Sequence, residues 1–155
     1  SKQFDDISNE IKNNFTYCWY YFFEFILIFT NRWKKQVGDL EIFSVGMVIM
    51  WHSLVTKSYQ ANGWNFSKWK KIKIKVPETG VNTMSISEIT NIPRPTVVRK
   101  LNYLLKNKYI SVNKKKLFNV NMQDKTLTDT IKLQEKNVVS LAYLVFKIFN
   151  QINIK

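Results

Sequence analysis

Two prolines separated by a single residue, Pro93 and Pro95, limit the fold of this chain more than any other feature. A proline disfavours helical backbone at the residue before it, so a helix that precedes Pro93 must end near Asn91, which tolerates the left-handed backbone of a tight turn. The Ser85-Ile-Ser-Glu88 pattern is a capping box and predicts that this first helix begins at Ser85. Because proline suits the first turn of a helix, a second helix is expected to open at Pro95.

The segment after Pro95 has the spacing of an amphipathic helix. Its apolar residues recur every three or four positions: Val97, Leu101, Leu104 and Leu105. Its other face has polar and basic residues: Arg94, Thr96, Arg99 and Lys100. The sequence therefore predicts a second helix with one buried face and one basic, exposed face.

Two short runs that favour β-strands follow this helix, at residues 109–112 and 117–120. Asn113, Lys114, Lys115 and Lys116 join them as a tight turn, so a hairpin with a cationic tip is expected. A helix, a turn, a second helix and a basic hairpin follow one another in a winged helix-turn-helix. We therefore predict this unit over residues 83–122, in a fold that is otherwise mainly α-helical.

The run Ile86-Ser-Glu-Ile-Thr-Asn-Ile-Pro-Arg-Pro-Thr-Val-Val-Arg-Lys-Leu101, continued by Asn-Tyr-Leu-Leu-Lys-Asn-Lys-Tyr-Ile110, resembles the DNA-binding segment of MarR and IclR regulators. In those families a glycine is common at the turn and at the exit from the second helix. Here Asn91 and Lys108 occupy these places, and the wing is shorter than usual. The long helices expected on both sides resemble MarR more closely, because IclR regulators have a large separate effector domain.

The MarR resemblance implies a homodimeric, cytoplasmic transcription regulator that binds double-stranded DNA and needs no cofactor or metal. Its terminal helices would form the dimer interface and set the spacing of two recognition helices. The resemblance also implies a small-molecule effector pocket beside the interface. The residues that would line this pocket are Trp51, His52, Trp64 and Trp69.

The residues outside 83–122 predict long helices with unusually large apolar surfaces, which form one domain of residues 1–155 together with the motif. In the N-terminal part, residues 1–60, one helix is expected from Phe4 to about Gln36, apolar almost all round between Phe15 and Phe29. Gly38 and an Asp39 cap separate it from a second helix that ends near Tyr59. A last helix is expected over residues 124–155, capped by Asp124 or Thr126. Either a second subunit covers the apolar faces, or the chain wraps around its own central helix.

The net charge of +13 favours an anionic partner, although an AT-rich genome would also enrich the chain in lysine. The placement of the charge is more informative than its total. Residues 64–123 contain 13 Lys or Arg and only two acidic residues, Glu78 and Glu88, which is +11 of the total. Residues 89–123 contain no acidic residue at all. This stretch includes the predicted second helix and the hairpin.

The expected DNA contacts fall on three segments of the chain. Arg94 and Arg99 are two of only three arginines, and the guanidinium fork can hydrogen-bond guanine in the major groove or a phosphate. The alternating run of residues 71–76 predicts a short edge strand in a loop over residues 60–80, with Trp64, Phe66 and Trp69 as its anchors. The candidate contacts are Arg94, Pro95, Thr96, Val98, Arg99 and Lys100 in the helix, Asn113, Lys114, Lys115 and Lys116 in the hairpin, and Lys71 and Lys73 in the loop.

Other functions find less support in the sequence. An enzyme is not expected, because the chain has one histidine, one cysteine, no glycine-rich phosphate loop and no set of metal ligands. Cys18 is expected to be a buried packing residue in a reducing compartment. No signal peptide is visible, and the apolar run from Phe15 to Phe29 is too short to span a bilayer, so no membrane partner is expected. Two alternatives stay open: nonspecific or replication-related DNA binding, and a basic module that docks on a membrane surface or a protein.

Overall fold

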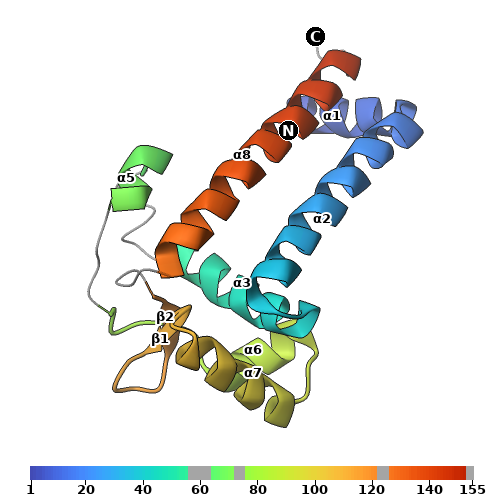
Figure 1. The fold of residues 1–155 in the computed structure, drawn as a ribbon. Helices are drawn as coiled ribbons and strands as arrows, with labels where there is room; N and C mark the ends of the chain where they lie inside the picture. The colour runs from blue at the N-terminus through green and yellow to red at the C-terminus, as the bar shows by residue number, and fades with distance from the viewer. Residues whose placement is uncertain (56–63, 72–75, 122–125, 153–155) are drawn as a thin grey trace. The chain divides into compact units, whose positions relative to one another are not determined.

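The computed structural model describes residues 1–55, 64–71, 76–121 and 126–152, and these are mainly α-helical with one small antiparallel sheet (Figure 1). The chain divides into two compact units. One, which we call the helical unit, consists of Ser1–Trp33 and Lys132–Lys155. The other, the central unit, consists of Lys34–Ile131. Each is described separately below.

The N-terminal segment forms two helices, α1 (Lys2–Asn13) and α2 (Phe15–Val37), where the sequence predicted one. The break lies at Asn14, whose backbone has left the helical region at φ −115° and ψ 34°. Both its backbone N–H and its side-chain Nδ2 donate to the Glu10 carbonyl, at 3.0 and 2.9 Å. An asparagine that binds the preceding turn in this way ends a helix without glycine or proline, so the prediction of one uninterrupted helix was wrong.

Polar side chains join α2 to α8 (Thr126–Gln151) within the helical unit, where Figure 1 shows the two helices side by side. Arg32 donates to Ser140 Oγ at 2.7 Å and to Asn137 Oδ1 at 3.3 Å. Asn137 is 5% exposed, so its amide is satisfied in the interior. Cys18 is 1% exposed, as the sequence predicted, and burial raises the pKa of its thiol.

Helix α3 (Leu40–Val55) lies at the centre of the central unit and packs against α6 (Thr83–Thr90) and α7 (Arg94–Lys106). Gly38, at φ 117°, ends α2, and Asp39 Oδ1 accepts from the Ile42 N–H at 2.7 Å, so the predicted break and cap are confirmed. Fully buried side chains from the three helices form the core: Val45, Ile49, Ile86, Val97, Leu101 and Leu104. The second predicted helix extended to about residue 59, and residues 56–63 lie outside the described part of the chain.

The segment before α6 differs from its prediction. Residues 66–71 form the short helix α5 (Phe66–Lys71) instead of a loop. Asn65 Oδ1 accepts from the Lys68 N–H at 2.9 Å and caps this helix, and the rings of Phe66 and Trp69 stack 5.7 Å apart. Lys71 is therefore the last residue of a helix and not the first of a strand. Residues 72–75, the rest of the predicted strand and with them Lys73, lie outside the described residues.

Helices α6 and α7 meet in the predicted tight turn. Asn91 adopts the left-handed conformation at φ 56° and ψ 25°, which confirms the turn. Helix α6 begins at Thr83 and not at Ser85, because Asn82 Oδ1 accepts from the Ser85 N–H at 2.8 Å and provides the cap. The predicted capping box was therefore wrong. Helix α7 begins at Arg94, one residue before Pro95, with the proline in its first turn.

The predicted hairpin is confirmed as β1 (Ile110–Val112) and β2 (Phe118–Val120), which pair antiparallel with Ile110 opposite Val120. A bridge adds a third segment to this sheet, since Val81 and Phe118 exchange two backbone hydrogen bonds of 3.1 and 2.8 Å. Gly80 makes this close approach possible: at its φ of 150°, a Cβ atom would lie 2.8 Å from the Phe118 carbonyl oxygen. The hairpin is thus fixed to the residues just before α6.

The last predicted helix is present as α8, from Thr126 to Gln151. Residues 122–125 lie outside the described part of the chain, and so does the proposed Asp124 cap. The side chain of Thr126, the alternative cap, is likewise not described. Between Val138 and Phe149 this helix exposes most of its apolar side chains.

Candidate nucleic-acid interface

Helix α7 has one buried face and one exposed face. Val97, Leu101 and Leu104 are at most 2% exposed and anchor the helix in the core of the central unit. The exposed residues follow one another at helical spacing along the other side: Arg94, Pro95, Val98, Arg99, Asn102, Tyr103 and Lys106. From Arg94 to Asn102 this face extends about 12 Å, which corresponds to roughly three to four base-pair steps of about 3.4 Å each.

The turn before α7 is held by hydrogen bonds to α6. Ser87 Oγ donates to the Ile92 carbonyl at 2.6 Å, and Thr90 Oγ1 accepts from the Ile92 N–H at 3.3 Å. Ile92 itself is 9% exposed, so an apolar anchor lies between the two helices. The exposed start of α7, with Arg94, therefore projects from a defined turn.

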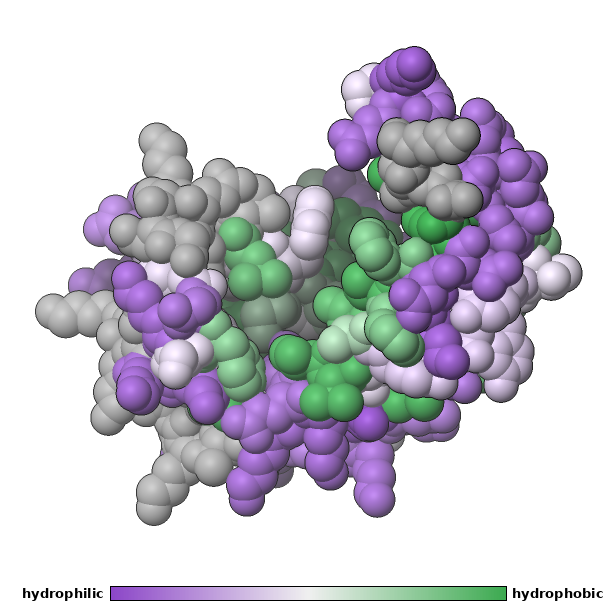
Figure 2. Space-filling view, turned by 90° about the horizontal axis from the view of Figure 1, so that it is seen from above, coloured by the Kyte–Doolittle hydropathy of each residue, from purple (hydrophilic) through white to green (hydrophobic). Residues whose placement is uncertain are grey.

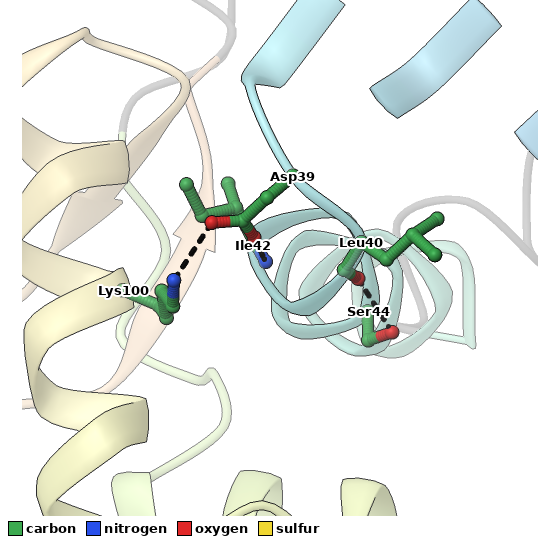
Figure 3. A network of polar contacts seen from close by, with 5 residues as sticks. All are labelled: Asp39, Leu40, Ile42, Ser44 and Lys100. Carbon is green, nitrogen blue, oxygen red and sulfur yellow. Dashed lines mark hydrogen bonds and ion pairs between the residues drawn. The ribbon is translucent and has the colours of Figure 1, made fainter. Parts of the chain in front are cut away.

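Lys100 was a candidate DNA contact, and the structure gives it a partner within the protein (Figure 3). Its Nζ lies 2.7 Å from Asp39 Oδ2, and its side chain is only 17% exposed. Partial burial alone would raise the pKa of Asp39. The hydrogen bond from the Ile42 N–H and the hydrogen bond and positive charge of Lys100 have the larger effect, so the pKa is lowered overall. The ion pair links the start of α3 to the middle of α7, which makes Lys100 a positioning residue for this helix. Thr96 is also half-buried.

Asn113 organises the hairpin turn. Its Oδ1 accepts from the backbone N–H groups of Lys115 and Leu117, at 2.9 and 3.0 Å. Its Nδ2 lies 3.0, 2.9 and 3.2 Å from the carbonyl oxygens of residues 77, 78 and 79. The side chain thus fixes both the turn and the segment beside it, so we assign it a structural role, and the DNA contact stays a prediction.

The lysines of the turn have the exposure that the sequence predicted. Lys114, Lys115 and Lys116 are all exposed, and Lys116 adopts a left-handed conformation at φ 59°. Asn119 is 2% exposed and donates to the Thr79 carbonyl at 2.8 Å, which attaches β2 to the same segment as Asn113. Three cationic side chains therefore project from a hairpin that is attached to its own unit at two positions.

The remaining candidates lie elsewhere in the central unit. Lys71 is exposed at the end of α5. Of the proposed effector-pocket residues, Trp51 is 59% exposed, which does not suit the lining of a closed pocket, and Trp64 and Trp69 are half-buried. His52 Nδ1 is buried with no hydrogen-bond partner among the described residues.

The sequence reasoning missed Asn102 as a possible contact. It lies three residues after Arg99 on the exposed side of α7, and it is exposed. The sequence contains a signal for this residue. Asparagine lowers helix propensity, and no local pattern explains an asparagine in the middle of this helix.

Comparisons with protein-family models, with curated proteins and with solved structures find no match for this chain. Among the described residues, none of the helices taken alone has both the length and the apolar composition that a membrane span requires. Helix α2 and residues 40–54 meet these two requirements only when they are taken together, and the chain bends between them.

Proposed function

We propose that this chain binds double-stranded DNA as a homodimeric transcription regulator of the winged helix-turn-helix type. Helix α7 enters the major groove, and the lysine-rich hairpin contacts the flanking phosphates. The observation that supports this most directly is the exposed face of α7, where Arg94 and Arg99 project from a helix whose opposite face is anchored in a hydrophobic core.

The distribution of charge supports an anionic partner for this face. No acidic residue occurs between Ile89 and Gln123, and Lys100 forms its ion pair with Asp39, which precedes this stretch in the chain. Arg94, Arg99 and the turn lysines are left exposed. Counterion release from phosphates by such side chains supplies most of the nonspecific affinity of DNA-binding proteins.

The surface of the helical unit supports a dimer. Phe23 is 54% exposed, Leu27 63%, Val139 70% and Phe149 70%, and Figure 2 shows hydrophobic side chains at the surface beside hydrophilic ones. Soluble monomers rarely expose apolar residues in such number, and a second copy of the chain would cover them. A twofold dimer would also present two α7 helices to two half-sites.

The salt dependence of DNA binding tests the hairpin contact. Changing Lys114, Lys115 and Lys116 together to Ala is expected to reduce the slope of log K against log salt by about 3, at about 0.9 for each lost phosphate contact. A matched control changes three exposed lysines of the helical unit, Lys2, Lys12 and Lys136, to Ala. An equal loss of slope in both variants would mean that only the total charge matters, and the hairpin contact would be refuted.

The exposed apolar residues also favour a second candidate function, docking of the helical unit on an anionic membrane surface. Co-sedimentation with vesicles that contain anionic lipid separates the two. The regulator proposal expects a dimer that stays in the supernatant and selects an enriched sequence from a random duplex pool. Binding to vesicles without any enriched sequence would favour the membrane role, whereas DNA binding without enrichment would favour a nonspecific DNA-binding protein.

A further inference from the structure

Asn102 and Val98 lie one helical turn apart on the exposed face of α7, with Arg99 between them. We propose that this pair recognises adenine and thymine, so that each half-site contains an A·T pair contacted by Asn102 and, about two base pairs away, a thymine contacted by Val98. The inference rests on the proposed function and adds the base identity to it.

Asn102 has no structural role within the described residues that would account for it. Most other described asparagines are used by the fold: Asn82 caps α6, Asn107 donates to the Tyr103 carbonyl at 2.9 Å, and Asn113 and Asn119 fix the hairpin. Asn102 is exposed in the middle of α7, and its side chain has no hydrogen-bond partner among the described residues. Asparagine is a poor helix former, so this position weakens the helix without compensation inside the protein.

Val98 supports the same conclusion. It is 43% exposed on the face that also carries Arg94, Arg99 and Asn102, whereas the neighbouring Val97 is completely buried. The core therefore does not require an apolar residue at position 98. A valine between two arginines in a helix that meets DNA presents methyl groups to the floor of the groove.

The chemistry of these side chains selects the bases. The asparagine amide can accept from adenine N6 and donate to N7 at the same time, and apolar side chains contact the C5 methyl group of thymine. Four residues of helix advance about 6 Å, which is close to two base-pair steps of about 3.4 Å each. Asn102 and Val98 can therefore reach base pairs that are about two steps apart.

Base analogues test the two contacts separately. A preferred site is first selected from a random duplex pool with the wild-type protein. Replacing the conserved adenine by 7-deazaadenine removes N7, and we expect wild-type affinity to fall roughly tenfold, while Asn102→Ala binds both duplexes equally. Replacing the conserved thymine by uracil removes the methyl group, and we expect it to weaken the wild type but not Val98→Ala. Asn150→Ala, an exposed asparagine of α8, serves as the matched control and should behave like the wild type.

The outcomes separate this inference from the proposed function. If the wild type selects a site and Asn102→Ala keeps the same sensitivity to 7-deazaadenine, the adenine contact is refuted while sequence-specific binding stands. If the site selected by the wild type contains no conserved A·T pair, the inference is also refuted. If the wild type enriches no sequence at all, both the proposed function and this inference fail.

Discussion

The Asn113→Ala variant tests whether one side chain holds the hairpin in place. The wild-type side chain accepts two backbone hydrogen bonds inside the turn, from Lys115 and Leu117. It also lies within 3.2 Å of three carbonyl oxygens of the segment 77–79. Because the amide nitrogen has two hydrogens, these three contacts amount to two full donor bonds. The substitution therefore removes about four hydrogen bonds.

The expected loss of stability follows from their surroundings. Most of the bonds of Asn113 are exposed, so water can replace the missing partner, and each bond is worth about 0.5 kcal/mol, the lower end of the usual range. We therefore expect Asn113→Ala to lower the free energy of unfolding by about 2 kcal/mol. The loss would be larger if the bonds were buried.

Urea unfolding, followed by tryptophan fluorescence, measures this loss. All variants are compared at one protein concentration, because the unfolding midpoint of a dimer depends on concentration. The m-value should stay unchanged, since the folded core is the same. Asn102→Ala is the matched control: the residue is exposed, and alanine is the better helix former, so the change should stay within about 0.5 kcal/mol. A loss for Asn113→Ala no greater than that of the control would refute the assigned structural role.

Three further variants test the core, the ion pair and the dimer surface. Leu101→Ala should lower the free energy of unfolding by about 2 to 5 kcal/mol in urea, because Leu101 is 2% exposed in the core; a loss below 1 kcal/mol would contradict its burial. Asp39→Asn keeps a helix cap but removes the charge. Because the folded-state pKa of Asp39 is lowered, its contribution to stability is present above the ordinary carboxyl pKa and is lost as pH falls through the lowered value. The Asp39→Asn variant should lack this part of the dependence of stability on pH. A variant whose stability depends on pH in the same way as the wild type would refute the stabilising role of the Asp39 charge. Phe149→Glu should shift the dimer toward monomer in sedimentation velocity, because Phe149 is 70% exposed on the proposed interface. If the variant stays dimeric, Phe149 does not belong to the dimer interface.

The helices and the hairpin of the central unit could be predicted because their signals are local. Pro93 and Pro95 limit where helices can end and begin, Asn91 adopts the left-handed turn, and the spacing from Val97 to Leu104 gives the buried face. These constraints act within a few residues of the chain. Tertiary packing therefore had little opportunity to overrule them.

The errors in the fold arose where asparagine side chains compete with the expected pattern. Asn14 ends α1 by bonding the Glu10 carbonyl, and Asn82 caps α6 three residues before Ser85, where the predicted capping box begins. Asn65 starts a short helix in what the sequence predicted as a loop. Asparagine is compatible with caps, turns and helix ends alike, so composition alone does not determine which of these it forms.

The site was predicted in part, and the missing part depends on long-range contacts. The exposure of Arg94 and Arg99 followed from the helical spacing. The partner of Lys100 is Asp39, which lies 61 residues away in the sequence, and Asn113 bonds to carbonyls 34 to 36 residues away. No local pattern identifies such pairs, so two side chains with structural roles were predicted as DNA contacts.

These internal contacts bear on how the proposed interface binds. Within the central unit, the core holds α7 through Leu101, and Asn113 and Asn119 hold the hairpin to the segment before α6. Both basic surfaces are therefore already ordered in the free protein, so less conformational entropy would be lost in the proposed DNA binding. Asn113→Ala should consequently weaken binding to every DNA sequence about equally although it removes no charge, because the hairpin must then be ordered at the interface. Asn102→Ala should instead reduce the preference for the selected site over random duplex, since it removes the proposed base contact and leaves the hairpin intact. The ratio of the two affinities in each variant thus separates a residue that positions the interface from one that determines its specificity.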